Sequence, residues 1–145
     1  MTLSHPLSIY LCGGSSEIDL VEHYVAAVRE LGMRVTFDWT AHMRAANAAD
    51  RDLSSTVRLA SAQGDLSAIL DASIVWYLAP VKPSFGAGVE FGWALARRAA
   101  RQQIGLLASG DTAHSIFTSL SDRCFADHEE ALEYLRLLTS ARRPR

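Results

Sequence analysis

Lysine and cysteine are scarce in this sequence, and no apolar run is long. One lysine, Lys82, stands against thirteen arginines, and acidic and basic side chains nearly balance at a formal net charge of −2. This balance gives no support for binding nucleic acid or an anionic membrane through bulk charge. The apolar runs are too short to span a bilayer, and the N-terminus lacks a basic segment followed by a long apolar stretch. We therefore expect a cytoplasmic protein without nucleic-acid or membrane partners.

Metal and disulfide chemistry also lack support. The two cysteines, Cys12 and Cys124, have no metal-type spacing, and both lie in apolar, strand-like contexts that favour buried free thiols. The five histidines show no ligand spacing either, so the sequence predicts no metal and no cofactor. A serine hydrolase is disfavoured because the Gly-x-Ser-x-Gly elbow is missing.

Short apolar strands alternate with helical stretches along the chain. Strands are expected at residues 7–12, 33–37, 73–78, 104–108 and 124–125. Helices are expected at residues 17–31, 53–70, 87–100, 112–120 and 129–138. Residues 41–52 show no clear period and are expected to form a loop, whereas Trp76 and Tyr77 are expected in the core. The alternation predicts one doubly wound, flavodoxin- or Rossmann-like α/β domain over residues 1–140, with about five parallel strands flanked by helices and a basic, disordered tail at 141–145.

In such sheets the ligand lies beyond the carboxyl ends of the strands, near the point where the strand order reverses. That rule selects the loops at residues 13–16, 38–40 and 80–90. The first of these loops consists of Gly13, Gly14, Ser15 and Ser16. Its bare amides and hydroxyls favour an anion or a sugar hydroxyl at a helix N-terminus. Tight strand-to-helix turns use glycine in any case, so a structural explanation stays open.

The stretch KPSFGAGVEFGWA, residues 82–94, places Glu90 among glycines and apolar side chains. Glu90 is expected in the first turn of a helix, where amide dipoles stabilise an ionised carboxylate. Gly86 and Gly88 would let a substrate approach the backbone closely. From spacing alone, Glu90 either serves a ligand or only satisfies the helix N-terminus.

Two further side chains are expected at the same crevice. Asp65 would pair with Glu90, and two carboxylates suffice for glycosidic chemistry. Asp71 competes with Asp65 for that role, although an aspartate at a helix-to-strand turn is commonly structural. Trp39 follows Asp38 out of the second strand, where its ring would either stack on a nucleobase or only shield the end of the sheet.

These motifs resemble the nucleoside 2-deoxyribosyltransferase superfamily, and within it the 2'-deoxynucleoside 5'-phosphate N-hydrolases. The similarity covers most of the chain, from Ser8-Ile9-Tyr10-Leu11-Cys12-Gly13 to about Phe117. Its most specific part is Pro83-Ser84-Phe85-Gly86-Ala87-Gly88-Val89-Glu90-Phe91-Gly92, which is close to the Pro-Ser-x-Gly-x-Gly-x-Glu-x-Gly of the N-hydrolases. Asp65-Leu66 fits their second carboxylate, and residues 35–40 resemble a stretch of bacterial members of the superfamily.

The resemblance implies that Glu90 attacks the anomeric carbon, displaces the base and forms a glycosyl-enzyme ester. Asp65 would protonate or orient the leaving base, and Tyr10 matches a tyrosine near the nucleophile. A homodimer is also implied, in which Ser115 is lent to the neighbouring subunit's phosphate site. The crevice loops and the resemblance together give as substrate-binding residues Gly13, Gly14, Ser15, Ser16, Asp38, Trp39, Ser84, Gly86, Gly88 and Ser115.

The chain departs from the family pattern at three places, one of which, Ser73 in place of an aspartate at the start of the third strand, is expected to affect structure only. The N-hydrolases carry a phosphate-gripping arginine in the first loop, where this chain has Ser16. The transferases carry Asp-x-Gly-Thr where this chain has Ser84-Phe85-Gly86-Ala87, which favours a hydrolase. We expect an enzyme that cleaves the N-glycosidic bond of a nucleoside or nucleoside 5'-monophosphate. The alternatives are a nucleoside 2-deoxyribosyltransferase and a nucleotide-sensing module without turnover, which would not require the nucleophile.

Overall fold

A computed structural model describes residues 5–48, 55–112 and 115–142 of the chain. Five parallel strands form one sheet in the order β2-β1-β3-β4-β5. The strands are β1 (Ser8–Cys12), β2 (Arg34–Val35), β3 (Ile74–Leu78), β4 (Gly105–Ser109) and β5 (Arg123–Phe125). The sheet and its flanking helices confirm the predicted doubly wound α/β fold, and the strand order reverses between β1 and β3.

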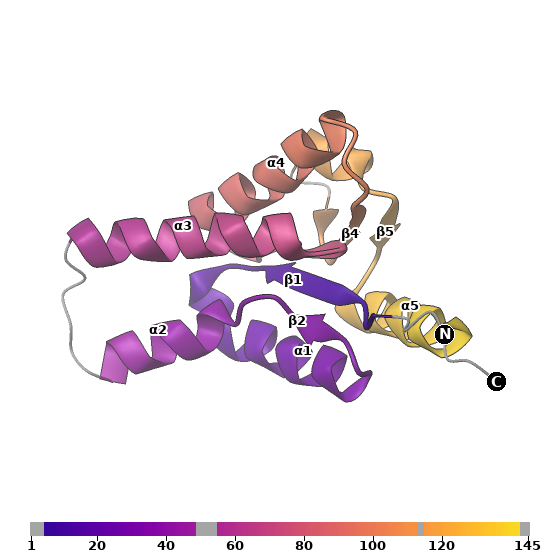
Figure 1. Ribbon diagram of the computed structural model, residues 1–145, viewed down its shortest axis with the longest axis horizontal. Helices are drawn as coiled ribbons and strands as arrows, with labels where there is room; N and C mark the ends of the chain where they lie inside the picture. The colour runs from indigo at the N-terminus through magenta and orange to yellow at the C-terminus, as the bar shows by residue number, and fades with distance from the viewer. Residues whose placement is uncertain (1–4, 49–54, 113–114, 143–145) are drawn as a thin grey trace.

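Helices cover both faces of this sheet. They are α1 (Ile18–Glu30), α2 (Trp39–Ala48), α3 (Ser55–Asp71), α4 (Phe85–Ala99) and α5 (His128–Ala141), with short 3-10 turns η1 (Ser15–Glu17) and η3 (Ile116–Leu120). Figure 1 shows α3 and α4 together on one side of β1, and α1 and α2 on the other. Helix α5 packs against α1, β4 and β5. The carboxyl ends of β1 and β3 therefore open between two layers of helices.

The loop predicted at residues 41–52 is wrong where the structure describes it, because α2 begins at Trp39 and runs to Ala48. The Asp38 carboxylate accepts a hydrogen bond from the Ala41 amide at 3.2 Å, which satisfies one of the first amides of the helix. Alanine has the highest helix propensity, and four of the ten residues of α2 are alanine. Such a helix forms without the regular apolar spacing on which the prediction depended.

The other predicted helix and strand boundaries differ less from those of the structure. Strand β2 has two residues instead of the predicted five, and the helix expected at 112–120 is a 3-10 turn that begins at Ile116. Helix α5 continues three residues beyond the predicted end, and residues 143–145 of the predicted tail lie outside the described part of the chain. Among the described helices, none is long and apolar enough to cross a bilayer.

The core forms around β1 and β3, whose apolar runs are covered on both faces. Trp76 is fully buried as predicted, and its indole nitrogen donates to Ser109 Oγ at 2.7 Å. Tyr77, predicted in the core, is only partly buried and lines a cavity. Both cysteines are free, as expected, but Cys124 is exposed because β5 lies at the edge of the sheet.

Glycine at position 13 is a packing requirement of the β1–α1 turn. A Cβ atom at this position would lie 2.4 Å from Val21 Cγ2 in α1. We predict that Gly13→Ala lowers the free energy of unfolding by about 1–3 kcal/mol, since overpacking forces the helix to shift. Urea denaturation measures this change. Gly64→Ala is the control: a Cβ there meets nothing within 4 Å in the middle of α3, so that variant gains up to about 1 kcal/mol. Equal effects of the two substitutions would contradict this explanation.

Candidate active site

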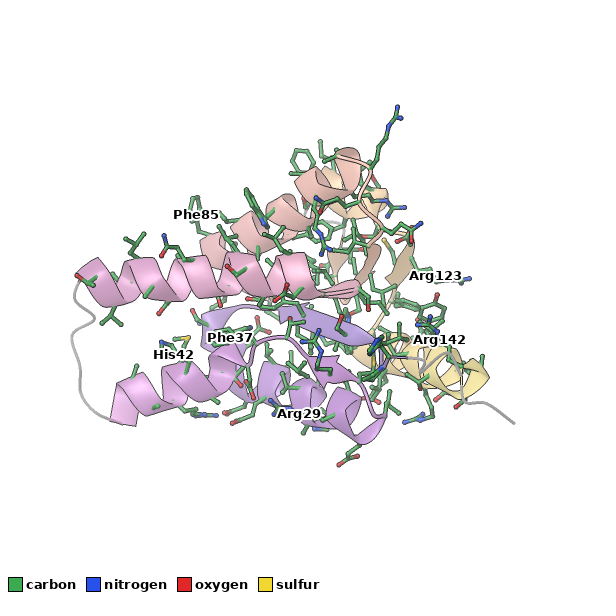
Figure 2. All side chains as sticks on the ribbon, in the orientation of Figure 1. Arg29, Phe37, His42, Phe85, Arg123 and Arg142 are labelled. Atoms are coloured by element: carbon green, nitrogen blue, oxygen red, sulfur yellow. The ribbon has the colours of Figure 1, made fainter. Side chains whose placement is uncertain are left out.

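A cavity of about 350 Å³ opens at the carboxyl edge of the sheet, between β1 and β3. Its walls come from the loop after β1, from α2 and α3, and from the start of α4. Figure 2 shows Phe37 and His42 in the space between α2 and α3. The predicted site residues that line this cavity are Gly13, Ser15, Trp39, Asp65, Ser84, Gly86 and Glu90. The structure thus brings together residues from all three loops selected by the sequence.

Glu90 does not cap its helix. Because α4 begins at Phe85, two residues earlier than expected, Glu90 lies in the second turn rather than the first. Ser84 is the cap, and its Oγ accepts a hydrogen bond from the Ala87 amide at 3.3 Å. The alternative in which Glu90 only satisfies the helix N-terminus is therefore wrong. The carboxylate is left to face the cavity.

Three buried oxygens without a hydrogen-bond partner lie near one another: two belong to carboxyls that line this cavity, and the third belongs to a tyrosine beside them that does not line it. They are Tyr10 Oη, Asp65 Oδ1 and Glu90 Oε2, and they come from β1, α3 and α4. The Tyr10 hydroxyl lies close enough to both carboxylates to influence their pKa values, although it forms no well-directed hydrogen bond with either. An unpaired buried polar group costs about 1–3 kcal/mol, and it is paired once a ligand supplies a partner.

Burial is the main influence on the protonation of the pair. Burial and, to a lesser extent, the nearby Asp65 raise the pKa of Glu90 to about 8, although Tyr10 and the Cys12 thiol act in the opposite direction. Burial also raises the pKa of Asp65, against the lowering effect of the Tyr10 hydroxyl and of His42. The pKa of Tyr10 is raised by burial and by Glu90, so its hydroxyl stays a donor. Two carboxyls that compete for one proton are suited to acid–base and nucleophilic roles.

The two carboxylates are held at a fixed relative position by their helices. Helices α3 and α4 pack side by side on one face of the sheet. Near the end of α4, the Arg97 guanidinium donates to the carbonyl oxygens of Ile69 and Ala72, where α3 ends. Asp65 and Glu90 therefore sit on two helices that are joined by hydrogen bonds beyond the cavity.

Trp39 forms a fixed part of the wall. Its side chain is 7% exposed, and its Nε1 donates to the Leu11 carbonyl at 3.0 Å. The ring also lies behind Gly13, with Cζ2 3.7 Å from the position of a Cβ there. Trp39 thus shields the end of β1 and also presents an aromatic surface to the cavity, and its stacking on a nucleobase stays a prediction.

Asp38, Ser16 and Gly14 do not line the cavity. The Asp38 carboxylate pairs with Arg29 at 3.0 Å and caps α2, and these bonds lower its pKa despite its burial. Ser16 is exposed to solvent. Gly14 is buried, and a Cβ there would lie 3.0 Å from Pro80, so this glycine lets the first and third loops meet.

Gly88 and Ser115 line a second cavity of about 450 Å³ that shares Ser84 with the first. Ser115 caps η3, and its Oγ accepts a hydrogen bond from the Phe117 amide at 3.2 Å. The predicted binding residues that line a cavity are therefore divided between two neighbouring cavities that meet at Ser84.

One wall of the first cavity was not predicted. It comprises Phe37, His42, Met43, Arg58, Ser61 and Ala62. His42 Nε2 lies 3.1 Å from Ser61 Oγ and links α2 to α3. His42 and Met43 belong to the segment predicted as a loop, and Phe37 was predicted as the end of the second strand. The other half of the wall was within reach of sequence analysis, because residues 58, 61, 62 and 65 lie on one face of a helix at spacings of three and four.

The sequence matches no known protein-family profile and no curated protein. The fold is similar to that of the CMP N-glycosidase BcmB of Clostridium botulinum, with a TM-score of 0.54 and 19% sequence identity. The similarity covers 90% of this chain and 98% of that one. At this identity the likeness establishes the shared fold.

The raised pKa of Glu90 predicts a pH-dependent stability. In the unfolded chain the carboxyl titrates near 4.5, and in the folded protein near 8. The folded state therefore prefers the protonated form, and stability is lost as pH rises from about 4.5 to about 8. We expect Glu90→Gln to remove this loss, so that its stability relative to wild type rises by a few kcal/mol between pH 4.5 and 8.5.

Urea denaturation at the two pH values measures this difference. The exposed Glu30, at the end of α1, provides the matched control through Glu30→Gln. A Glu90→Gln stability change that does not vary with pH would show that the carboxyl is not held in an unfavourable environment.

Proposed function

We propose that the chain cleaves the N-glycosidic bond of a nucleoside or nucleoside 5'-monophosphate through a covalent intermediate on Glu90. The observation that carries this proposal is the presence of the buried, unpaired carboxyl oxygens of Asp65 and Glu90 at one cavity, with the unpaired Tyr10 hydroxyl beside them. A pair of carboxyls beside an aromatic wall provides a nucleophile, a proton donor and a surface for a base. The likeness to a protein described as a CMP N-glycosidase gives independent support.

In the first step, ionised Glu90 attacks the anomeric carbon, and the bond from that carbon to the base nitrogen breaks. The electron pair goes to the base, which takes a proton from Asp65. In the second step, Asp65 removes a proton from water, the water oxygen bonds to the anomeric carbon, and the ester to Glu90 breaks. Because the free site favours the proton on Glu90, that proton must pass to Asp65 as the substrate binds, which ionises the nucleophile and supplies the proton that the base takes. The Tyr10 hydroxyl, as a donor beside Glu90, favours the ionised form.

Water as the acceptor makes the enzyme a hydrolase, whereas a second base would make it a transferase. We propose a hydrolase, because Ser84-Phe85-Gly86-Ala87 stands in place of the Asp-x-Gly-Thr of the transferases that the chain resembles. Ser84 is used here as the cap of α4.

We also propose that the protein forms a homodimer through the outer face of α4 and the η3 turn. Phe85, Val89 and Trp93 lie one turn apart along α4 and are 90%, 48% and 42% exposed. Figure 2 shows Phe85 at the start of α4, projecting outward. On η3, Ile116 and Phe117 are 81% and 57% exposed, directly after Ser115. Exposed apolar surfaces of this kind mark interfaces, and a second copy here would bring further groups to the cavity that Ser115 lines.

The catalytic proposal predicts base release from at least one member of a panel of nucleosides and their 5'-monophosphates, measured by chromatography. We expect Glu90→Gln to lower kcat/KM by at least about 10³-fold, because no nucleophile remains. Asp65→Asn is expected to lower it by about 10²–10⁴-fold through loss of the proton donor.

Asp71→Asn is the matched control for the carboxylate pair. Asp71 lies at the exposed end of α3, away from the cavity, and its replacement should leave kcat/KM within about twofold of wild type. Binding of nucleotides without any base release would favour the sensing module instead. A new nucleoside formed after addition of a second free base would identify a transferase.

The dimer proposal predicts that Phe85→Asp increases the dimer dissociation constant by at least about tenfold, since a charge would be buried in an apolar interface. Sedimentation equilibrium measures this constant. Leu137→Asp is the control, because Leu137 is 62% exposed on α5, outside the proposed interface. A wild-type chain that sediments as a monomer at about 100 μM would refute the proposal.

A further inference from the structure

Acidic side chains surround the start of α4 on several sides. Asp65 and Glu90 line the first cavity, and Asp111 lines the second. Glu17 lies behind the first loop, where its Oε2 accepts a hydrogen bond from the Val81 amide at 2.9 Å. The same oxygen is 3.4 Å from the position of a Cβ on Gly14. Glu17 thus places a carboxylate where the first and third loops meet.

The positively charged or titratable nitrogens lie on a different part of the cavity walls from the start of α4. Among the described residues that line the two cavities, the cationic or titratable nitrogens are those of His42 and Arg58. Both belong to the α2–α3 wall, and Arg58 is seven residues from Asp65, about 10 Å along the helix axis. Lys82 is exposed and lines neither cavity. His128 is close enough to Glu17 to be influenced by it, but burial lowers the pKa of His128, which keeps the ring neutral near pH 7.

The residues that line the first cavity suggest one orientation for a bound nucleoside. Phe37, Trp39 and Met43 give an apolar, partly aromatic surface on the α2 side, which suits the base. With the anomeric carbon at Glu90, the 5' end of the sugar then lies toward Ser15, Ser84 and Gly86. This is the end of the cavity that lies nearest to Glu17.

The N-terminus of α4 has too little positive charge to bind a phosphate dianion well. A helix N-terminus carries about half an elementary positive charge. Two of its amides are already used, because Ala87 donates to Ser84 Oγ at 3.3 Å and Gly88 donates to Ser84 O at 3.2 Å. Half a charge does not balance a phosphate dianion beside several carboxylates. A neutral 5'-hydroxyl needs a single partner, and the Ser84 hydroxyl still has its proton to donate.

We infer that the substrates of this site are nucleosides with a free 5'-hydroxyl, and that nucleoside 5'-monophosphates are discriminated against by the carboxylates around the start of α4. This inference rests on the proposed function. It narrows that function to one substrate class, and it assigns Glu17 a part in specificity without contact to the reacting atoms.

The first test measures binding separately from catalysis. Glu90→Gln protein, which cannot form the ester, is titrated by calorimetry with each nucleoside of the panel and with its 5'-monophosphate. We expect the preferred nucleoside to bind at least about tenfold more tightly than its monophosphate at 20 mM salt. The ratio of the two dissociation constants, monophosphate over nucleoside, should fall several-fold at 0.5 M salt, because salt screens the repulsion between the phosphate and the carboxylates.

The second test uses Glu17→Gln, whose amide oxygen can still accept from Val81 while the charge is removed. We expect kcat/KM for the monophosphate to rise about threefold to tenfold, and kcat/KM for the nucleoside to change by less than twofold. Asp19→Asn is the control, since Asp19 is an exposed carboxylate on the next turn that pairs with Arg44. It should alter neither value.

The two proposals fail in different ways. Equal or tighter binding of the monophosphate to the Glu90→Gln protein overturns the inference, whether or not the wild type releases base. Selective binding of nucleosides without base release from any substrate overturns the proposed catalysis and upholds the inference. Failure of both ligand classes to bind at 1 mM overturns both.

Discussion

Two carboxyls share one cavity, and the burial of their oxygens without hydrogen-bond partners is the constraint on which the rest of the site depends. Asp65 and Glu90 are carried by neighbouring helices on one face of the sheet, with Tyr10 of β1 beneath them. Such a group of unpaired oxygens is costly in the empty protein, and the core around β1 and β3 must offset that cost. Sites that serve only stability rarely retain such an arrangement, whereas sites of chemistry often do.

Much of the fold could be predicted because a parallel sheet leaves a simple pattern in the sequence. Strands buried on both faces appear as short apolar runs, as at residues 8–12 and 74–78, and helices separate them. The rule that ligands bind at the carboxyl ends of such strands then selected the loop that ends at Glu90, which lines the cavity. Asp65 lies outside the loops that this rule selects, and its choice over Asp71 depended on the family resemblance.

The features of the fold and the site that were not predicted depend on contacts that no local sequence pattern encodes. Helix α2 is stabilised by its alanines and by the Asp38 cap, so its part of the cavity wall was missed. The start of α4 at Phe85 depends on the Ser84 cap, and this moved Glu90 into the second turn. That Gly88 and Ser115 belong to a separate cavity follows from the path of the chain after β4, which the spacing of residues does not reveal.

The hydrogen bonds from Arg97 to the end of α3 have a consequence for altering this protein by design. They fix the spacing of the two carboxyls from outside the cavity, about two helical turns beyond Glu90. The α2 wall contributes nothing to that linkage. Residues of α2 can therefore be substituted while Asp65 and Glu90 keep their relative position; under the proposed function, base preference and bond cleavage then become separable parts of one pocket.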